Sequence, residues 1–192
     1  MALIVVDVQR DFCEGGALPA ADTLSLLQPL QQSIDAARRA GAVLVYTKDW
    51  HPSDHSSFHI SGGPWPIHCV AGSTGAELMP PLDPQSGEVV IHKGAHRDGA
   101  GYSGFDLTGL ENKLRDLQVQ RVAVSGIATE YCVRATALDA LQHGLQVSVL
   151  TDLIRAVQPG QSAKILAELQ AAGAKPMSSA EWLKELQAAN PG

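Results

Sequence analysis

The chain has 192 residues, of which 45% are hydrophobic and 18% are charged, a composition typical of a folded globular protein and not of a disordered one. The net charge of −6 argues against a general nucleic-acid binder, which needs clustered lysine and arginine to neutralise phosphates. A single domain spanning residues 1–192 is the expectation for this length.

Neither a secretion signal nor a membrane span is expected. The N-terminal apolar run stops at Asp7, too early for the apolar region of a signal peptide. No stretch approaches the roughly 18 uninterrupted apolar residues of a membrane helix. The cysteines, Cys13, Cys69 and Cys132, are odd in number and widely spaced, so we expect no disulfide framework. These features favour a reducing, cytoplasmic setting, and they leave open whether the chain forms a homo-oligomer.

Short runs rich in valine, isoleucine and leucine predict strands, in chain order at residues 2–6, 42–47, 88–93, 121–127, 145–152 and 174–177. The first five runs are nearly continuous rather than alternating, which is typical of strands buried on both faces. The last run is weaker, and its Pro176 favours an edge position because proline lacks the N–H that a ladder needs.

Longer amphipathic stretches between the runs predict helices at residues 22–40, 108–117, 129–143, 159–172 and 179–189. The first of them starts at a capping residue, Asp22, and is followed by Gly41 in the position of a C′ glycine. Pro29 inside it predicts a kink or a later helix start. Alternating strands and helices predict parallel strands joined by helical crossovers. The predicted fold class is therefore α/β, a three-layer sandwich with a six-stranded, mostly parallel sheet and helices on both faces.

Reactive side chains follow four of the predicted strands. Asp7 follows the first, Asp49 and His51 follow the second, Lys93 ends the third, and the fourth leads into Cys132. Ligands of open α/β sheets bind beyond the carboxyl ends of the strands, so we expect these side chains to meet at one edge of the sheet. A long connection, residues 50–87, and a shorter glycine-rich one, residues 94–107, interrupt the regular alternation of elements. Loops longer than about 15 residues inside compact domains are usually functional or disordered.

Asp7, Lys93 and Cys132 have the chemistry of nucleophilic catalysis. If Thr129 caps the helix, Cys132 lies in its first turn, where the helix dipole favours a thiolate. A nearby lysine would favour the thiolate further, and an aspartate could accept the thiol proton. Each residue alone also has a structural explanation, because Asp7 could end a strand, Lys93 could lie on the surface and Cys132 could fill the core. Together on one sheet edge they favour catalysis.

Asp49, His51 and His68 are candidate metal ligands. The first two are separated by one residue just past a strand, and His68 could return from the long connection to join them. One carboxylate with two imidazoles is a set used by catalytic zinc and by non-haem iron. His55 and His59 are also available, and Asp-x-His pairs are common in solvated loops, so the spacing alone leaves the metal site open.

Two other patterns are interpreted without a function. Residues 99–104, GAGYSG, match the spacing of a dinucleotide-binding loop but do not open a helix directly after a strand, so we reject that reading. Cys69 lies beside His68, but no second cysteine is found at zinc-site spacing, so packing is the expected role.

With these residues assembled, the sequence resembles the nicotinamidases of the isochorismatase-like cysteine hydrolase superfamily. The similarity runs in order through IVVDVQRDFCEGGALP (4–19), TKDWHPSDHSSF (47–58), GPWPIHCVAGSTGAEL (63–78), HKGAHRDGAGYSGF (92–105) and GIATEYCVRATALDAL (126–141). The pairing of DWH with WPIHC is specific to the nicotinamidase/pyrazinamidase branch, whereas the aspartate–lysine–cysteine set is shared by the wider superfamily.

The resemblance implies a catalytic triad, a metal site and a substrate pocket. The implied triad is Asp7, Lys93 and Cys132, and the implied intermediate is a thioester on the cysteine. The implied oxyanion donors are the backbone N–H groups of Ala128 and Cys132. The resemblance also implies a cis peptide bond between Ile127 and Ala128. The implied ligands of one divalent metal ion are Asp49, His51 and His68, with zinc expected and iron or manganese as alternatives; His55 matches a position that binds metal in only some members. The implied substrate-binding residues are Phe12, Trp65 and Tyr102.

The reaction that the resemblance implies is hydrolysis of nicotinamide to nicotinate and ammonia in NAD salvage, with pyrazinamide as a further substrate. Two alternatives remain at this point. A related amidohydrolase acting on a carbamoyl or ureido compound would keep the triad but should lack the DWH and WPIH segments. A non-enzymatic metal-binding or redox-sensing module would need neither Lys93 nor an aromatic pocket.

Overall fold

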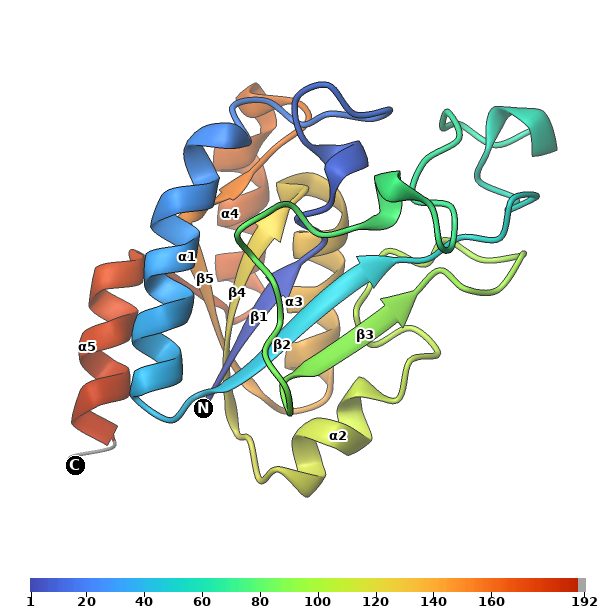
Figure 1. Cartoon of the computed structure of the whole chain (residues 1–192). Coiled ribbons are helices and arrows are strands. Elements are labelled where there is room, and N and C mark those ends of the chain that lie inside the picture. Colours follow the sequence, from blue (N-terminus) through green and yellow to red (C-terminus); the bar gives the residue numbers. More distant parts are fainter. Residues whose placement is uncertain (190–192) are drawn as a thin grey trace.

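The computed structural model describes residues 1–189, and its elements alternate as the sequence predicts (Figure 1). The strands are β1 (Ala2–Val6), β2 (Val43–Asp49), β3 (Val89–Lys93), β4 (Arg121–Ile127), β5 (Gln146–Arg155) and β6 (Lys175–Met177). The α-helices are α1 (Leu24–Arg39), α2 (Leu110–Asp116), α3 (Arg134–Gln142), α4 (Ser162–Ala171) and α5 (Ser179–Ala189). The strands form one sheet in the order β3-β2-β1-β4-β5-β6, and neighbouring strands are parallel. The predicted α/β fold class is confirmed, and Pro176 lies in the edge strand β6 as expected.

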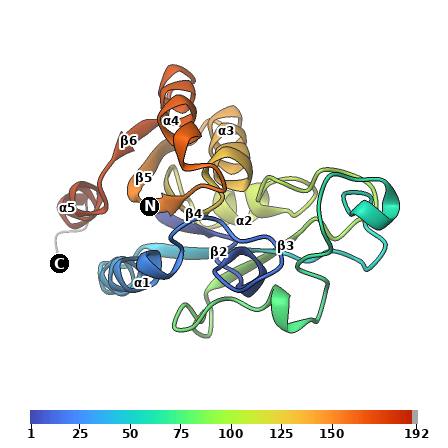
Figure 2. The same ribbon diagram turned by 90° about the horizontal axis from the view of Figure 1, so that it is seen from above.

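Helices cover both faces of this sheet, with α1 and α5 on one side and α2, α3 and α4 on the other (Figure 2). The central strand β1 is buried along its whole length. Its Leu3 and Val5 belong to the core under α1 and α5, whereas Ile4 and Val6 belong to the core under the other three helices. Because successive side chains of a strand point to opposite faces, a strand between two helix layers must be apolar at every position. This explains the continuous apolar runs of the inner strands. The expectation that the run at residues 88–93 is also buried on both faces is wrong, because β3 is an edge strand whose residues alternate between buried and exposed.

The crossover connections change face between β1 and β4. From β1 the chain returns through α1 to β2 on one face, and from β4 it returns through α3 to β5 on the other face. Ligands of open α/β sheets bind at such a reversal, beyond the carboxyl ends of the strands. Asp7 follows β1 and Cys132 follows β4, so these two residues flank the reversal.

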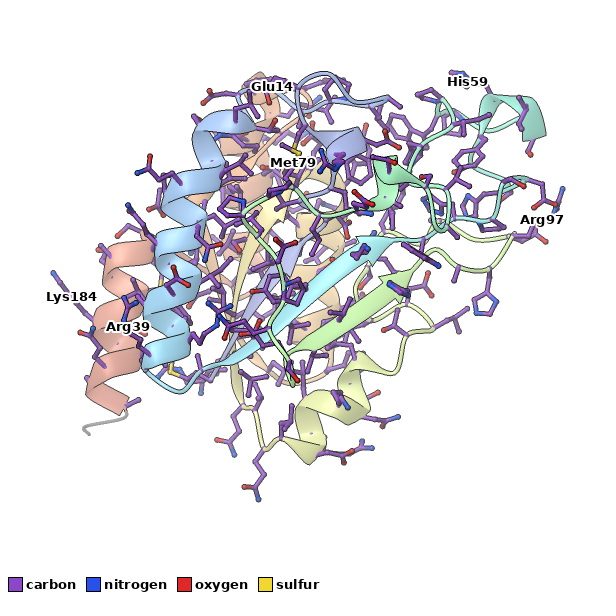
Figure 3. All side chains as sticks on the ribbon, viewed as in Figure 1. Glu14, Arg39, His59, Met79, Arg97 and Lys184 are labelled. Carbon is purple, nitrogen blue, oxygen red and sulfur yellow. The ribbon has the colours of Figure 1, made fainter. Side chains whose placement is uncertain are left out.

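Two long connections extend beyond the carboxyl ends of β2 and β3. Figure 3 shows their outer parts, where His59 and Arg97 are labelled. The two connections are joined, because the Ser56 N–H donates to the Arg97 carbonyl at 2.8 Å and the Arg97 guanidinium lies 3.2 Å from Asp54. Among residues 1–189 no helix has the length and apolar character needed to cross a membrane.

The first helix differs in detail from its prediction. It begins at Leu24 after Thr23, because Asp22 has a φ of 55° and so lies outside the helical conformation. Pro29 lies within α1 and does not end it. The loss of one helical N–H is tolerated where Leu26, Leu30 and Ile34 bury one face of the helix in the core.

Candidate active site

Lys93 is the centre of a buried ionic cluster at the carboxyl edge of the sheet. Its Nζ lies 2.8 Å from Asp7 Oδ2, 2.5 Å from Asp49 Oδ1 and 3.3 Å from Cys132 Sγ. It also donates a hydrogen bond of 2.9 Å to the carbonyl of Gly101. Lys93 is only 1% exposed, so the alternative of a surface lysine is wrong. A buried ammonium of this kind is stable because opposite charges and hydrogen-bond acceptors surround it.

The charges in this cluster decide which group holds a proton. Burial lowers the pKa of Lys93, but Asp49 and Asp7 outweigh it and hold this pKa above its usual value, so the amine is an ammonium. Burial raises the pKa of Asp7, and the nearby Lys93 offsets this only in part. Burial acts on Asp49 in the same direction, but Lys93 and His51 outweigh it and the pKa of Asp49 is lowered. Asp7 is therefore the carboxylate better suited to accept a proton.

Asp7 is held by its neighbour on β2. The Asp7 N–H donates to the Thr47 carbonyl at 3.2 Å, and the Thr47 hydroxyl donates to Asp7 Oδ1 at 2.7 Å. One carboxylate oxygen thus faces Thr47 and the other faces Lys93. Sequence reasoning missed Thr47, although a buried hydroxyl directly after the apolar part of β2 was a sign that a polar group lies opposite.

Cys132 lies in the turn that follows β4. The residue at the start of this turn is Ala128, whereas Thr129 makes no side-chain cap, and Thr129–Val133 form a π-helical turn before α3. The predicted Thr129 cap is therefore wrong. The peptide bond between Ile127 and Ala128 is cis, as the resemblance implies.

The resting state of Cys132 also differs from the sequence expectation that its surroundings favour a thiolate. Burial raises the pKa of Cys132 well above its usual value, and Asp7 and Asp49 add to this effect, while Lys93 lowers the pKa only in part. The resting thiol is protonated. Its Sγ and a carboxylate oxygen of Asp7 lie within 4.8 Å of each other, so a proton acceptor is close by.

Asp49, His51 and His68 converge beside this cluster. One potential ligand atom from each lies within 4.8 Å of the others, and the three residues are 2–4% exposed. Nδ1 of His51 lies 2.9 Å from the Gly94 carbonyl, and Nδ1 of His68 lies 2.8 Å from the Pro66 carbonyl. A histidine that donates Nδ1–H to a carbonyl presents the lone pair of Nε2, the form that binds metals. The set therefore fits a divalent metal of the zinc or iron type.

A second group of potential ligands does not form a metal site. Asp7, Asp49 and Cys132 also approach one another within 4.8 Å. The ammonium of Lys93 lies in contact with all three, so a cation already occupies the space between them. Asp49 belongs to both groups and joins the ionic cluster to the metal-ligand set, with its Oδ2 3.4 Å from His51 Nε2.

The remaining histidine and cysteine candidates lie outside the three-residue set. His55 is fully buried with its ring 4.2 Å from that of His51; its Nδ1 contacts the Ser57 hydroxyl at 2.7 Å, and its Nε2 has no hydrogen-bond partner. His59 lies on the surface. Cys69 is buried, which raises the pKa of its thiol, in agreement with a packing role.

A small cavity of about 40 Å³ ends at the thiol. All three predicted aromatic residues line it, and the Trp65 indole N–H donates to the Tyr102 hydroxyl at 3.0 Å. Tyr131, which sequence reasoning missed, packs against both, with its ring 5.1 Å from Trp65 and 5.7 Å from Tyr102. The sign for it was an aromatic residue directly before the reactive cysteine. The full lining is Phe12, Leu18, Asp49, Trp65, His68, Tyr102, Ala128, Tyr131, Cys132 and Val157.

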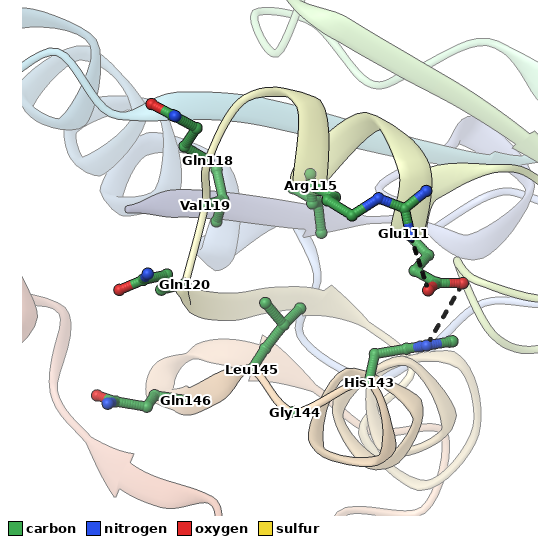
Figure 4. A pocket seen from close by; sticks show the side chains of 10 residues that line it. Glu111, Arg115, Gln118, Val119, Gln120, His143, Gly144, Leu145 and Gln146 are labelled. Carbon is green, nitrogen blue, oxygen red and sulfur yellow. Dashed lines mark ion pairs between the residues drawn. The ribbon is translucent and has the colours of Figure 1, made fainter.

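A larger, open hollow of about 870 Å³ lies at the opposite end of the sheet, before β4 and β5 (Figure 4). The Glu111 carboxylate lies 3.5 Å from the Arg115 guanidinium, so these two charges neutralise each other, and it lies 3.6 Å from the His143 ring. No nucleophilic hydroxyl, thiol or amine lines it. The chemistry, rather than the volume, identifies the small cavity beside Cys132 as the candidate active site.

Comparisons with known proteins agree on one family. The family model for the isochorismatase domain matches residues 1–181. The chain is 39% identical to the nicotinamidase of Escherichia coli, over 94% of this chain and 96% of that protein. It is 42% identical to the nicotinamidase/pyrazinamidase of Mycobacterium tuberculosis, over 89% and 95%. The crystal structure of the pyrazinamidase of Pyrococcus horikoshii in complex with zinc is similar in fold, with a TM-score of 0.89 and 45% identity, over 92% of this chain and 98% of that one.

Proposed function

The chain belongs to the isochorismatase family, and from this premise we propose that it hydrolyses nicotinamide to nicotinate and ammonia, as a step of NAD salvage, and also acts on pyrazinamide. One observation carries the proposal. The ammonium of Lys93 contacts the nucleophilic thiol, the carboxylate that can take its proton, and the carboxylate of the metal-ligand set. Acyl transfer and binding of a nitrogen heterocycle therefore belong to a single small site.

The first half of the reaction forms a thioester. The Cys132 thiol passes its proton to Asp7 as sulfur attacks the amide carbon, and Lys93 balances the charge of the carboxylate and thiolate. The backbone N–H groups of Ala128 and Cys132 stabilise the oxyanion. The carbon–nitrogen bond then breaks, and protonated Asp7 returns its proton to the leaving nitrogen, which departs as ammonia.

The second half of the reaction regenerates the enzyme. Water attacks the thioester while Asp7 takes one of its protons, the carbon–sulfur bond breaks, and the proton on Asp7 returns to the Cys132 sulfur. The product leaves as nicotinic acid and loses its remaining proton to the solvent, which gives nicotinate. The raised pKa of Asp7, which follows from its burial, suits a group that accepts and returns a proton twice in each turnover.

The proposed metal ligands are Asp49, His51 and His68, with zinc as the expected ion and iron or manganese as alternatives. A divalent ion held by these residues would supply a Lewis acid for the pyridine nitrogen of the substrate. Phe12, Trp65 and Tyr102 would hold the ring, together with Tyr131. The zinc in the Pyrococcus horikoshii pyrazinamidase supports this choice of metal.

Three broader features are part of the same proposal. A single hydrolase domain over residues 1–192 is the first of them, and the match of the family model to residues 1–181 supports it. The protein acts in the reducing cytoplasm, because Cys13, Cys69 and Cys132 are free thiols. It binds a small carboxamide and no nucleic acid, in keeping with its negative net charge.

The experiment that tests the function is an ammonia-release assay with nicotinamide, pyrazinamide and an N-carbamoyl compound, with metal analysis of the same sample. We expect turnover of the two aromatic amides, and Cys132→Ala should reduce it by at least about 10³-fold. Cys13→Ala, at a buried cysteine outside the site, is the matched control and should retain activity. Turnover of the carbamoyl compound alone would favour the related amidohydrolase. Oxidation of Cys132 without any amide turnover would favour a redox-sensing module.

A further inference from the structure

The side chain of Gln9 pairs with the backbone of Asp49. Gln9 is fully buried, its Nε2 donates to the Asp49 carbonyl at 2.9 Å, and its Oε1 accepts from the Asp49 N–H at 2.8 Å. The second hydrogen of Nε2 is donated to the Ala76 carbonyl at 3.0 Å. Both amide hydrogens of Gln9 are therefore used, and Asp49 is held at both of its backbone polar groups.

This pairing replaces a missing part of the sheet. The ladder between β1 and β2 ends where Val6 pairs with Thr47, and the Asp7 N–H makes the last backbone bond to β2. Asp7 has a φ of 47°, so the chain turns away there, two residues before β2 itself ends at Asp49. The Gln9 amide takes the place of the next peptide unit, and without it the N–H and C=O of Asp49 would lack these buried partners.

Asp11 holds the chain next to His68 in a similar way. Its Oδ2 accepts the N–H of Cys69 at 2.7 Å. Gly75 makes room for this carboxylate, because a Cβ at that position would lie 2.1 Å from Asp11 Oδ2. The bond fixes the residue that directly follows His68, and the neighbouring Phe12 packs its ring 5.5 Å from the His68 ring.

We propose that Gln9 and Asp11 are positioning residues for two of the proposed metal ligands, Asp49 and His68, and that they act through hydrogen bonds to the backbone of Asp49 and of Cys69. The inference rests on the proposed metal site. A ligand set binds a metal tightly only when its groups are already in place, and substitution of groups that orient ligands typically weakens metal affinity by about 10–100-fold. The turn after β1 thus has two roles, because Asp7 belongs to the ionic cluster while Gln9 and Asp11 position residues of the metal-ligand set.

The two residues should differ in their effect on catalysis. Gln9 acts on Asp49, whose carboxylate also contacts Lys93, so Gln9→Met should weaken zinc binding about 10–100-fold and also lower kcat at saturating zinc. Asp11 acts on His68, whose Nδ1 contacts the Pro66 carbonyl, and in the described part of the chain no hydrogen bond or ion pair joins His68 to Lys93 or to the thiol. Asp11→Ala should therefore weaken zinc binding by a similar factor and lower kcat at saturating zinc less than Gln9→Met does.

The measurement is the zinc dissociation constant of the full chain, obtained by competition with a chromophoric chelator, alongside the melting temperature. Asp11→Asn keeps an oxygen that can accept the Cys69 N–H, so it should restore zinc affinity to near the wild-type value. Ser125→Ala is the control for lost stability, since it removes a buried hydrogen bond of 3.2 Å to the Ile4 carbonyl away from the metal ligands. It should lower the melting temperature without changing zinc affinity.

A comparison in a second background separates positioning from general damage. If Gln9 acts through Asp49, Gln9→Met should have no further effect on zinc affinity in a chain that already carries Asp49→Ala. The inference is wrong if Gln9→Met binds zinc within threefold of the wild type, if Ser125→Ala weakens zinc binding equally, or if the effect persists in the Asp49→Ala background. It is also wrong if the wild type binds no zinc. Failure of the proposed function would instead be seen as a zinc-loaded wild type that releases no ammonia from nicotinamide.

Discussion

Replacing Lys93 by methionine tests whether the buried ammonium holds the site together. Methionine has a similar length and no charge, so Lys93→Met removes the contacts to Asp7 at 2.8 Å and Asp49 at 2.5 Å and leaves two carboxylates in the interior. Removing one partner of a buried ion pair costs about 3–5 kcal/mol. For a chain of this size each kcal/mol shifts the melting temperature by about 2–4 °C, so we expect a drop of about 6–20 °C at neutral pH.

The loss should depend on pH in a defined direction. Burial raises the pKa of Asp7 above the unfolded value of about 3.9, and without Lys93 this pKa rises further, because only weaker partners such as the Thr47 hydroxyl then oppose burial. The pKa of Asp49 rises as well, although His51 still opposes its burial. The folded variant then binds more protons than the unfolded chain, and its stability falls as pH rises from about 4 through the folded pKa values. In the wild type the pKa of Asp49 is lowered, so its contribution is lost on acidification instead. The difference between the two proteins should therefore narrow as pH falls.

The assay is thermal unfolding followed by circular dichroism between pH 4.5 and pH 8, with chelator present so that no metal compensates. Lys113→Met, at an exposed lysine of α2, is the matched control and should change the stability by less than about 0.5 kcal/mol. Adding Asp7→Asn to Lys93→Met should recover part of the lost stability, because one orphaned charge is removed. A Lys93→Met protein as stable as the wild type, or a loss that does not change with pH, would refute the reasoning.

Two further predictions concern a glycine beside the site and a distant ion pair. Gly94→Ala should weaken zinc binding at least about tenfold, because a Cβ there would lie 2.4 Å from Cε1 of His51. Gly87→Ala is the control and should leave zinc affinity unchanged, because Gly87 also has a positive φ but no atom lies within 4 Å of the added Cβ. Equal zinc affinity in the two variants would contradict this. Arg38→Ala should cost about 1–3 kcal/mol at pH 7, since its guanidinium bonds Glu88 at 2.7 and 3.2 Å. Burial raises the pKa of Glu88, but the hydrogen bonds from Arg38 and from the Gln85 N–H outweigh burial, so this pKa is lowered in the folded protein. The stabilisation by the ion pair is therefore present above about pH 4.5 and is lost as pH falls through the folded pKa of Glu88. Urea unfolding of both proteins at pH 7 and at pH 3.5 measures the difference.

Much of the fold could be predicted from local patterns. All six predicted runs correspond to strands, the five longer ones to β1–β5 and the weak one to the edge strand β6, and continuous burial of β1 follows from its lack of polar residues. Because the carboxyl ends of parallel strands share one edge, the convergence of Asp7, Asp49 and Lys93 followed from their places at strand ends. The parallel topology converts position in the sequence into proximity in space.

The helix boundaries and the cap before Cys132 were less predictable. Thr129 has the right side chain for a cap, yet it lies inside a π-helical turn that starts from Ala128. Helix ends depend on which backbone groups find acceptors after folding, and that is a property of the neighbouring chain as much as of the residue. Asp22 similarly lost its predicted role because its φ is positive.

The sequence by itself determined the layers of the fold, the strand ends and the reactive residue types, because these depend on periodicity and on the chemistry of single side chains. Only the tertiary structure decided that the Cys132 thiol rests in its protonated form, because its pKa depends on burial and on the distances to three charges. Only the tertiary structure showed that Thr47 faces Asp7 and that Gln9 pairs with Asp49, since each pair is separated by 40 positions in the chain. Such contacts exist only after distant segments pack together.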